Sequence, residues 1–268
     1  MIHKPTVNHI FDEKFKHGLD IIGLPADVMA WLQGEPLVYI HPYAELGGRP
    51  VRYQDPEGTV PVADIGDPVA AVVQPSLTLP PAEWPIVVTQ TIDSARPLWG
   101  GENVGDVYDG TQYLRAAGPF SLVPDNPISV VARATREADS ARSILSWSWG
   151  TTQAQMGLNL RGLSNQRAQL ILGGDNAGQS LNEAYPVTSD RRVIAGRSDG
   201  VASQVLLDGT QIASGAPGSL VPGEGDEDEI TIGAWDRGGS PTHHWVGVIG
   251  HVAIFESYLS DAEIGALS

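Results

Sequence analysis

Apolar residues occur along the chain mainly in short runs that alternate with polar residues or end at Gly, Pro, Asp or Asn. Alternation with a period of two is typical of a strand with one buried face. No long helical window separates these runs, so the pattern favours an antiparallel two-sheet sandwich over an α/β fold. From Gly34 onward the predicted strands are residues 37–40, 51–53, 69–73, 86–89, 128–134, 143–149, 157–160, 168–172, 192–195, 203–207, 229–233 and 246–255.

Two short helices are predicted, one near each end of the chain. The first covers residues 25–32, where apolar positions share one helical face. The second begins after the last strand, because Ser260 is a good N-cap and Glu263, three residues later, completes a capping box. The residues expected to face the protein core from these helices are Val28, Trp31, Leu32, Ile264 and Leu267.

Composition narrows the class of protein. The chain has 31 Gly, 20 Pro and 41% hydrophobic residues, which is typical of a globular protein rich in turns. It has no Cys, so disulfide scaffolds, thiolate nucleophiles and Cys-ligated zinc are excluded. A formal net charge of −16 disfavours binding to nucleic acid or to an anionic membrane surface. The sequence has neither an apolar run of membrane-spanning length nor a secretion signal, so we expect no membrane insertion and folding in the cytoplasm.

Charge is divided unevenly along the chain. Every lysine, namely Lys4, Lys14 and Lys16, lies near the N-terminus, and the remainder of the chain is strongly acidic. Residues 1–33 are therefore predicted to form an extended arm that attaches to an acidic neighbour, and the alternative is a frayed terminus. The arm is followed by an irregular lead-in with short strands over residues 34–105 and by a sandwich over residues 106–268.

Several motifs in the second half of the chain carry a family resemblance. Residues 205–210 (VLLDGT) contain an Asp-Gly turn between two strands, and residues 230–233 read ITIG. The chain ends with GVIGHVAIF at residues 247–255 and LSDAEI at residues 259–264, and DVYDGTQYL stands upstream at residues 106–114. In order and spacing these motifs resemble concanavalin-A-like and laminin-G-like domains. The resemblance implies an all-β jelly roll of two antiparallel sheets over residues 106–268.

The lead-in carries a second resemblance. YQDPEGTVPV at residues 53–62, GDPV at residues 66–69 and SARP at residues 94–97 are similar to the segment that precedes such domains in bacteriophage structural proteins. The similarity breaks at residues 73–84, where QPSLTLPP replaces the usual loop.

The second resemblance implies a non-enzymatic bacteriophage virion protein, either a tail or fibre adhesion component or a capsid-decoration component. Its partners would be other virion proteins and copies of itself, attached through Lys4, Lys14 and Lys16, and possible host-surface glycans bound through sandwich loops. The alternatives are a glycan-processing enzyme of the same fold and a free bacterial lectin-like module.

An acidic run at residues 224–229 is the candidate for catalytic carboxylates. Glu227 and Glu229 would share one face of a strand, but Thr231 takes the next position and Asp228 stands between them. Neither carboxylate then has an apolar neighbour to raise its pKa. A solvated loop is the favoured interpretation, and calcium binding at Asp226 and Asp228 is the alternative; we otherwise expect no cofactor. No nucleophile elbow, P-loop or dinucleotide-binding motif is present in the sequence.

The loop at residues 234–244 is the candidate ligand-binding surface. It joins two predicted strands at the rim of the sandwich and combines an aromatic residue with charged and imidazole side chains. A plain connection is the alternative. A zinc site at the adjacent histidines is disfavoured because neighbouring residues of a strand point to opposite faces. The candidate glycan-binding residues are Trp235, Asp236, Arg237, His243 and His244.

Two further features are interpreted as parts of the core. Trp147 and Trp149 lie on one face of a predicted strand, where an inward direction is favoured over a sugar-stacking platform. His251 lies inside the last predicted strand and is favoured as a core or flanking histidine.

Overall fold

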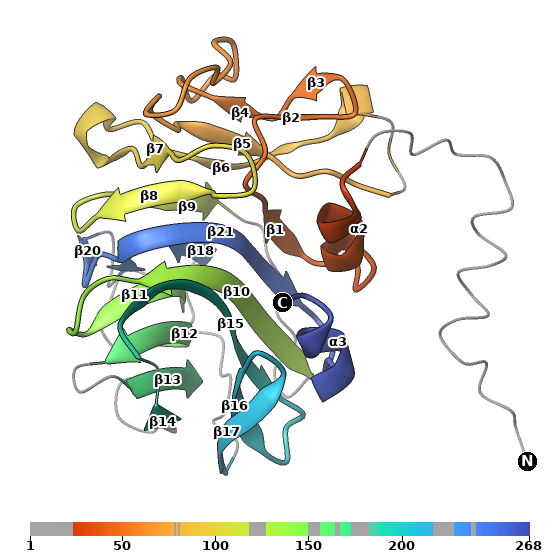
Figure 1. The fold of residues 1–268 in the computed structure, drawn as a ribbon, viewed down its shortest axis with the longest axis vertical. Coiled ribbons are helices and arrows are strands. Elements are labelled where there is room, and N and C mark those ends of the chain that lie inside the picture. The colour runs from red at the N-terminus through yellow and green to blue at the C-terminus, as the bar shows by residue number, and fades with distance from the viewer. Residues whose placement is uncertain are drawn as a thin grey trace, which may run out of the picture.

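A computed structural model describes residues 24–77, 79, 81–117, 127–149, 156–163, 167–172, 183–184, 186–216, 228–236 and 240–268. In this part of the chain two large antiparallel sheets are stacked face to face (Figure 1). Each strand predicted from the hydrophobic pattern overlaps a strand of the structure. The predicted all-β sandwich with a short C-terminal helix is therefore confirmed.

The first sheet has eight described strands, with β21 at its centre. One edge of β21 pairs with β10, and the other edge pairs with β8 near the start of β21 and with β1 near its end. The strands in spatial order are β17 (Thr210–Gly215), β16 (Ser203–Leu207), β15 (Thr188–Ser198), β10 (Ile128–Arg136), β21 (Val246–Phe255), β8 (Asp106–Asp109) and β7 (Leu98–Trp99), with β1 (Val38–Ile40) beside β21.

The second sheet has nine described strands and lies behind the first in Figure 1. In spatial order they are β14 (Glu183–Ala184), β13 (Arg167–Leu172), β12 (Met156–Leu163), β11 (Arg142–Trp149), β18 (Asp228–Ile232), β9 (Leu114–Ala117), β6 (Ile86–Thr89), β5 (Ala71–Val73) and β4 (Arg52–Tyr53). The remaining elements are the ribbons β2 (Glu45–Leu46) with β3 (Arg49–Pro50) and β19 (Trp235–Asp236) with β20 (Pro241–Thr242), the 3-10 turns η1 (Pro81–Glu83) and η2 (Asp93–Ala95), and the helices α2 (Ala26–Leu32) and α3 (Asp261–Gly265).

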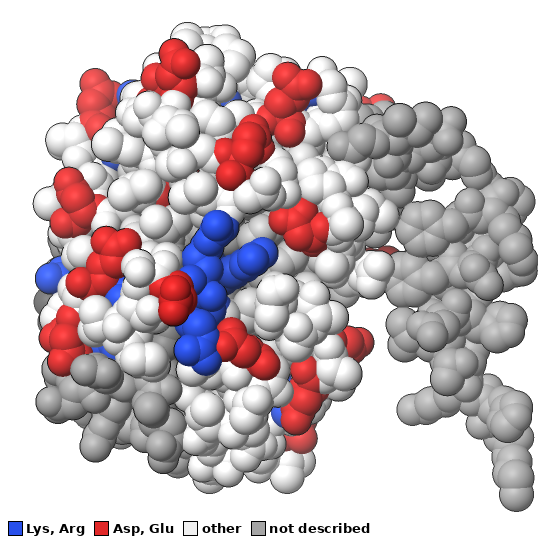
Figure 2. Space-filling model, in the orientation of Figure 1, with Lys and Arg blue, Asp and Glu red and all other residues white. Residues whose placement is uncertain are grey.

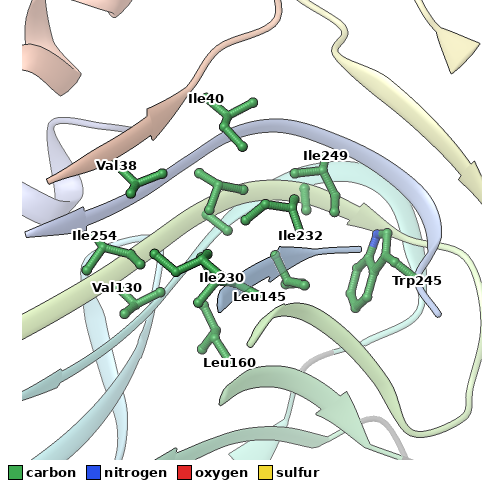
Figure 3. Close-up of a cluster of buried hydrophobic side chains, with 14 of the residues drawn as sticks. Val38, Ile40, Val130, Leu145, Leu160, Ile230, Ile232, Trp245, Ile249 and Ile254 are labelled. Carbon is green, nitrogen blue, oxygen red and sulfur yellow. The ribbon is translucent and has the colours of Figure 1, made fainter. Parts of the chain in front are cut away.

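The main core fills the space between the two sheets. Inward-facing aliphatic side chains of both sheets meet there, with fully buried Trp245 among them (Figure 3). Trp147 belongs to the same core and is also fully buried. The prediction that Trp147 points inward is confirmed. The side chain of Trp149 lies outside the described residues. Full burial of an aliphatic or aromatic side chain contributes roughly 1.5–3 kcal/mol, so this layer is the main source of stability.

A second core covers the outer face of the first sheet. Helix α2 packs Val28, Trp31 and Leu32 against this face, and α3 adds Ile264 and Leu267. Both predicted helical faces are therefore confirmed. At the start of α3 the side chain of Ser260 accepts a hydrogen bond from the backbone N–H of Glu263, and Glu263 completes the predicted capping box.

The lead-in is structurally continuous with the sandwich. Strands β4, β5 and β6 extend the second sheet beyond β9, while β1 and β7 belong to the first sheet. Backbone pairing therefore joins residues before and after position 106 in both sheets. The predicted arm, residues 1–33, ends in α2, and its first 23 residues lie outside the described part of the chain.

Two glycines are required by their backbone geometry. Asp208 and Gly209 both adopt positive φ, of 49° and 75°, which is the geometry of a tight hairpin turn and confirms the predicted Asp-Gly connection between β16 and β17. Gly233 has φ of 80°, and a Cβ atom there would lie 2.3 Å from the ring of Tyr108. Any larger residue at Gly233 would displace a core tyrosine that is itself buried.

A buried ion pair joins the lead-in to the first sheet. Nη1 of Arg52 on β4 donates to both carboxylate oxygens of Asp106 on β8, at 2.6 and 2.7 Å, and both side chains are fully buried. Burial raises the pKa of Asp106, and the attraction of Arg52 opposes this rise. The pair links an edge strand of one sheet to an inner strand of the other.

Candidate functional site

The site lies where β9, β18 and the β19–β20 ribbon meet on the outer face of the second sheet. Along β9, Leu114 and Ala116 point into the core, so Arg115 between them points outward. Its cross-strand neighbours are Thr231 of β18 and Thr89 of β6. The alternation of side chains along β9 therefore places Arg115 on the outer face of the second sheet, next to two threonines.

Arg115 is held in one orientation by two carboxylates. Its Nη2 donates to Oδ2 of Asp236 at 2.7 Å, and its Nε lies 2.8 Å from Oε1 of Glu229. The guanidinium group also lies 5.1 Å from the ring centroid of Tyr113. Arg115 and Glu229 remain 30% and 26% exposed, whereas Asp236 is fully buried. The side chain of Arg115 is thus held by its two carboxylate partners and by Tyr113, and part of it remains accessible to solvent.

The ribbon is anchored to the sheet by one serine. Ser146 on β11 donates its hydroxyl to the carbonyl oxygen of Ala234 at 3.0 Å, and the same hydroxyl accepts the backbone N–H of Asp236 at 3.1 Å. Ser146 belongs to the outward row of β11, between Leu145 and Trp147, which face the core. The segment 234–236 consequently lies flat against the outer face of the second sheet.

His244 closes the other side of the site. Its ring lies 5.8 Å from the ring of Tyr113, and its nitrogens lie 3.3 Å from the carbonyl oxygen of Gln112 and 3.2 Å from that of Pro241. We call Tyr113, Arg115, Glu229, Asp236 and His244 the rim cluster.

A buried hydroxyl lies beside the rim cluster without a partner. Thr231 is fully buried between Arg115 and Ser146, and its Oγ1 forms no hydrogen bond within the described structure. Polar atoms buried in this way normally have a partner, and because this hydroxyl is shielded from solvent it is not a contact for a molecule bound at the rim.

The structure corrects the predicted ligand loop. Trp235 and Asp236 are only 5% and 1% exposed, so neither is a surface contact. Trp235 is covered because the ribbon lies on the sheet and the His243 ring packs 5.0 Å from its own ring, and Asp236 is occupied by Arg115. His243 is exposed and His244 half-buried, so these two remain at the surface. Arg237 lies outside the described residues.

The acidic run and the possible metal sites are placed only in part. Glu229 lies on β18 and pairs with Arg115, while Glu227 and Asp226 lie outside the described residues. Asp228 begins β18, and its side chain is not among those described. Among the residues that are described, no three His, Asp or Glu side chains are grouped closely enough to hold a metal ion.

A second polar group lies inside the protein, between α2 and the first sheet. Tyr39 on β1 donates to Nδ1 of His251 on β21 at 2.9 Å, and Nε2 of His251 lies 3.3 Å from Oδ2 of Asp27 on α2. The Tyr43 hydroxyl donates to the same carboxylate at 2.8 Å. The order Asp, His, Tyr is that of a catalytic relay, but Tyr39 and His251 are 0% and 2% exposed. No substrate reaches them, so we assign the group a structural role.

Burial and hydrogen bonding set the charge states of this group. Burial raises the pKa of Tyr39 and lowers that of His251, which keeps both groups neutral. Burial opposes ionisation of Asp27, but the hydrogen bonds from His251 and Tyr43 outweigh it and lower its pKa to about 2. The prediction that His251 is a core histidine is confirmed.

Comparison with known proteins places the chain in a family. Residues 108–265, well over half of the chain, match the model of the Concanavalin A-like lectin/glucanases superfamily, so the protein belongs to this superfamily. No curated protein matches the sequence. No helix within the described ranges is long and apolar enough to cross a membrane.

Solved structures share parts of this fold. The Ruminococcus gnavus IT-sialidase CBM40 bound to alpha2,3 sialyllactose is 19% identical, with 53% of this chain and 82% of that chain covered and a TM-score of 0.47. The heptameric SAP-like pentraxin from Limulus polyphemus is 14% identical, with 59% and 78% covered and a TM-score of 0.47. The leech intramolecular trans-sialidase is 16% identical, with 53% and 23% covered and a TM-score of 0.46. At these identities the similarity concerns the fold alone.

Proposed function

We propose that this protein is a non-enzymatic glycan-binding module that contacts saccharides at the rim cluster. The observation that carries the proposal is the fixed, solvent-reachable guanidinium group of Arg115, held by two carboxylates above an aromatic ring. Saccharides are bound by convergent polar groups with defined directions. Tyr113 is buried and supports the guanidinium group from below. The superfamily's name covers both lectins and glucanases, which agrees with this class of ligand.

Preorganisation supports binding at this place. Arg115 is oriented before a ligand arrives, so little side-chain entropy is lost when a hydroxyl group replaces solvent on its exposed edge. Glu229 offers a carboxylate acceptor next to it. The same surface would accept a neutral or an acidic sugar.

The arrangement supports binding more than hydrolysis. A glycosidase of this kind needs two carboxyl groups about 5–9 Å apart, one of them protonated. Here Glu229 and Asp236 share one guanidinium partner, and Asp236 is buried away from any substrate. A glucanase remains the alternative function, and release of reducing sugar by the wild type that is lost in Glu229→Gln would favour it.

A glycan array probed with the full chain tests the proposal. We expect binding to a limited set of saccharides, with signals reduced in Glu229→Gln and in His244→Ala. Glu256→Gln is the matched control, because Glu256 is an exposed glutamate just after β21. Binding by neither wild type nor control, or signals equal in all variants, would contradict a saccharide site at the rim cluster.

The virion role stays a prediction of the sequence. Lys4, Lys14 and Lys16, the residues expected to attach the protein to other virion proteins or to copies of itself, lie outside the described residues. Deleting residues 1–17 tests it: the shortened protein should fold and keep its saccharide binding but fail to enter particles. Incorporation equal to that of the wild type would remove the arm from the account.

A further inference from the structure

An unusual pair of arginines lies on the opposite side of the molecule, on the outer face of the first sheet. On β10, Val131 contributes to the outer core and Arg133 is two residues further on, so both point outward. On β15 the same relation joins Val193 and Arg191. Figure 2 shows Lys and Arg atoms gathered in the middle of this face, with Asp and Glu atoms directly beside them.

The strand pairing brings the two arginines close together. Arg133 is directly opposite Val193, and Arg191 is two residues from Val193, next to the irregularity that interrupts the pairing between Ala134 and Arg136. In a regular strand pair such diagonal neighbours lie about 7–8 Å apart at the backbone, within reach of two long side chains. Burial lowers the pKa of Arg191, and the nearby positive charge of Arg133 lowers it further.

Neither arginine has an acidic partner in the described structure, although the chain has 32 Asp and Glu residues. Other arginines have described partners: Arg142 donates to Ser140 and to the carbonyl oxygen of His244, and six more form ion pairs. The described ion pairs are Arg52–Asp106, Arg96–Asp93, Arg115–Glu229, Arg115–Asp236, Arg136–Asp139, Arg192–Asp208 and Arg197–Asp261. Two adjacent like charges that form no ion pair cost free energy in the unliganded protein, and an anion bound between them would lower that cost.

The polar groups next to Arg133 already have partners of their own. On the β21 side, Arg133 is opposite His251, which is neutral and already occupied by Tyr39 and Asp27. The side chain of Tyr43 also lies within electrostatic range of Arg133, and its hydroxyl is committed to Asp27 and Asn103. Asp27 itself is bound by His251 and Tyr43. The neighbouring groups are therefore satisfied, and the two guanidinium groups remain for a ligand.

We propose that Arg133 and Arg191 form an anion-binding site on the outer face of the first sheet, which takes the carboxylate or phosphate group of a small ligand. Guanidinium groups match these oxyanions in geometry and donate paired hydrogen bonds to them. The site is separate from the rim cluster, which lies on the other sheet, so the two proposals stand independently.

The test is calorimetric titration of the full chain at low ionic strength with two probes, inorganic phosphate and glucuronate. We expect both to bind the wild type, with Arg133→Gln and Arg191→Gln each weakening binding by at least about tenfold, as loss of a charge-assisted hydrogen bond does. Tighter phosphate binding would identify a phosphate group as the ligand, and tighter glucuronate binding a carboxylate.

Arg192→Gln is the matched control, because it removes one positive charge from the same strand at a residue already paired with Asp208. We expect its affinity to stay within about twofold of wild type, as for a general charge effect. Folding is checked by thermal unfolding without ligand, where Arg133→Gln should be at least as stable as wild type because a like-charge contact is removed. Unchanged binding in both site variants, or equal weakening in the control, would overturn the proposal.

Discussion

Tyr39 and His251 form a buried hydrogen bond of 2.9 Å across 212 positions of the sequence. It joins β1 of the lead-in to β21, the central strand of the first sheet, and Asp27 of α2 completes the connection. The ring of Trp31, also on α2, stacks 5.0 Å from the His251 ring. The lead-in is thus tied to the sandwich through its core as well as through backbone pairing.

Replacing Tyr39 by Phe should lower the free energy of unfolding by about 1–3 kcal/mol, because it leaves a buried imidazole nitrogen without its partner. Urea denaturation measures the change. Tyr258→Phe is the control, since the Tyr258 hydroxyl bonds to Gln204 at the surface and its loss should cost much less. Equal costs for the two variants would contradict a structural role for the buried bond.

Stability should fall when the protein is acidified through the range in which unfolded histidine titrates. Burial lowers the pKa of His41 and His251, and nearby Arg52 adds to the effect at His41. Below about pH 6.5 the unfolded chain takes up protons that the folded protein does not, so the free energy of unfolding decreases as pH falls. Denaturation at a series of pH values should show this slope, with a smaller slope in His251→Gln. If the free energy of unfolding of His251→Gln depended on pH as steeply as that of the wild type, His251 would not be a source of the pH dependence.

Breaking the Arg52–Asp106 ion pair should strongly lower the free energy of unfolding. Asp106→Asn leaves a fully buried guanidinium group without its counter-charge, for which about 3–5 kcal/mol is the usual cost. Asp93→Asn is the matched control, since Asp93 pairs with Arg96 but is 87% exposed and should cost about 1 kcal/mol or less. The comparison is made by chemical denaturation, and similar values for both would contradict the burial of the pair.

Trp235→Ala should lower the stability of the fold rather than the affinity for saccharides. The side chain is 5% exposed and its ring packs against that of His243, so its loss should cost roughly 3–5 kcal/mol, as for other buried aromatic residues. In a variant that stays folded at low temperature, saccharide affinity should change little. A stable variant with abolished binding would restore Trp235 as a ligand contact.

Local sequence rules predicted the parts of the fold that depend on local chemistry. The strands were found because hydrophobic alternation persists over several residues, and α3 because Ser260 and Glu263 form a complete capping box. The Asp208–Gly209 turn was found because few other residue pairs adopt two positive φ angles. These signals need no knowledge of distant residues.

Long-range contacts explain what the sequence did not reveal. Trp235 and Asp236 were expected at the surface, but Ser146, 90 positions away, anchors their segment to the sheet. Arg115 was not recognised, because its partners Glu229 and Asp236 follow more than 100 residues later; the available signal was an arginine between two core-facing residues of β9. The joining of the lead-in to both sheets likewise depends on pairings that no local pattern encodes.

The most direct test of saccharide binding at the rim cluster is the dissociation constant of the best array ligand for Arg115→Lys. Lysine keeps the charge that Asp236 requires but loses the paired donors of the guanidinium group, so the fold should persist. Arg192→Lys, at an arginine paired with Asp208 on the other sheet, is the control. We predict at least about tenfold weaker binding for Arg115→Lys and an unchanged control. An affinity of Arg115→Lys equal to that of the wild type would contradict saccharide binding at the rim cluster.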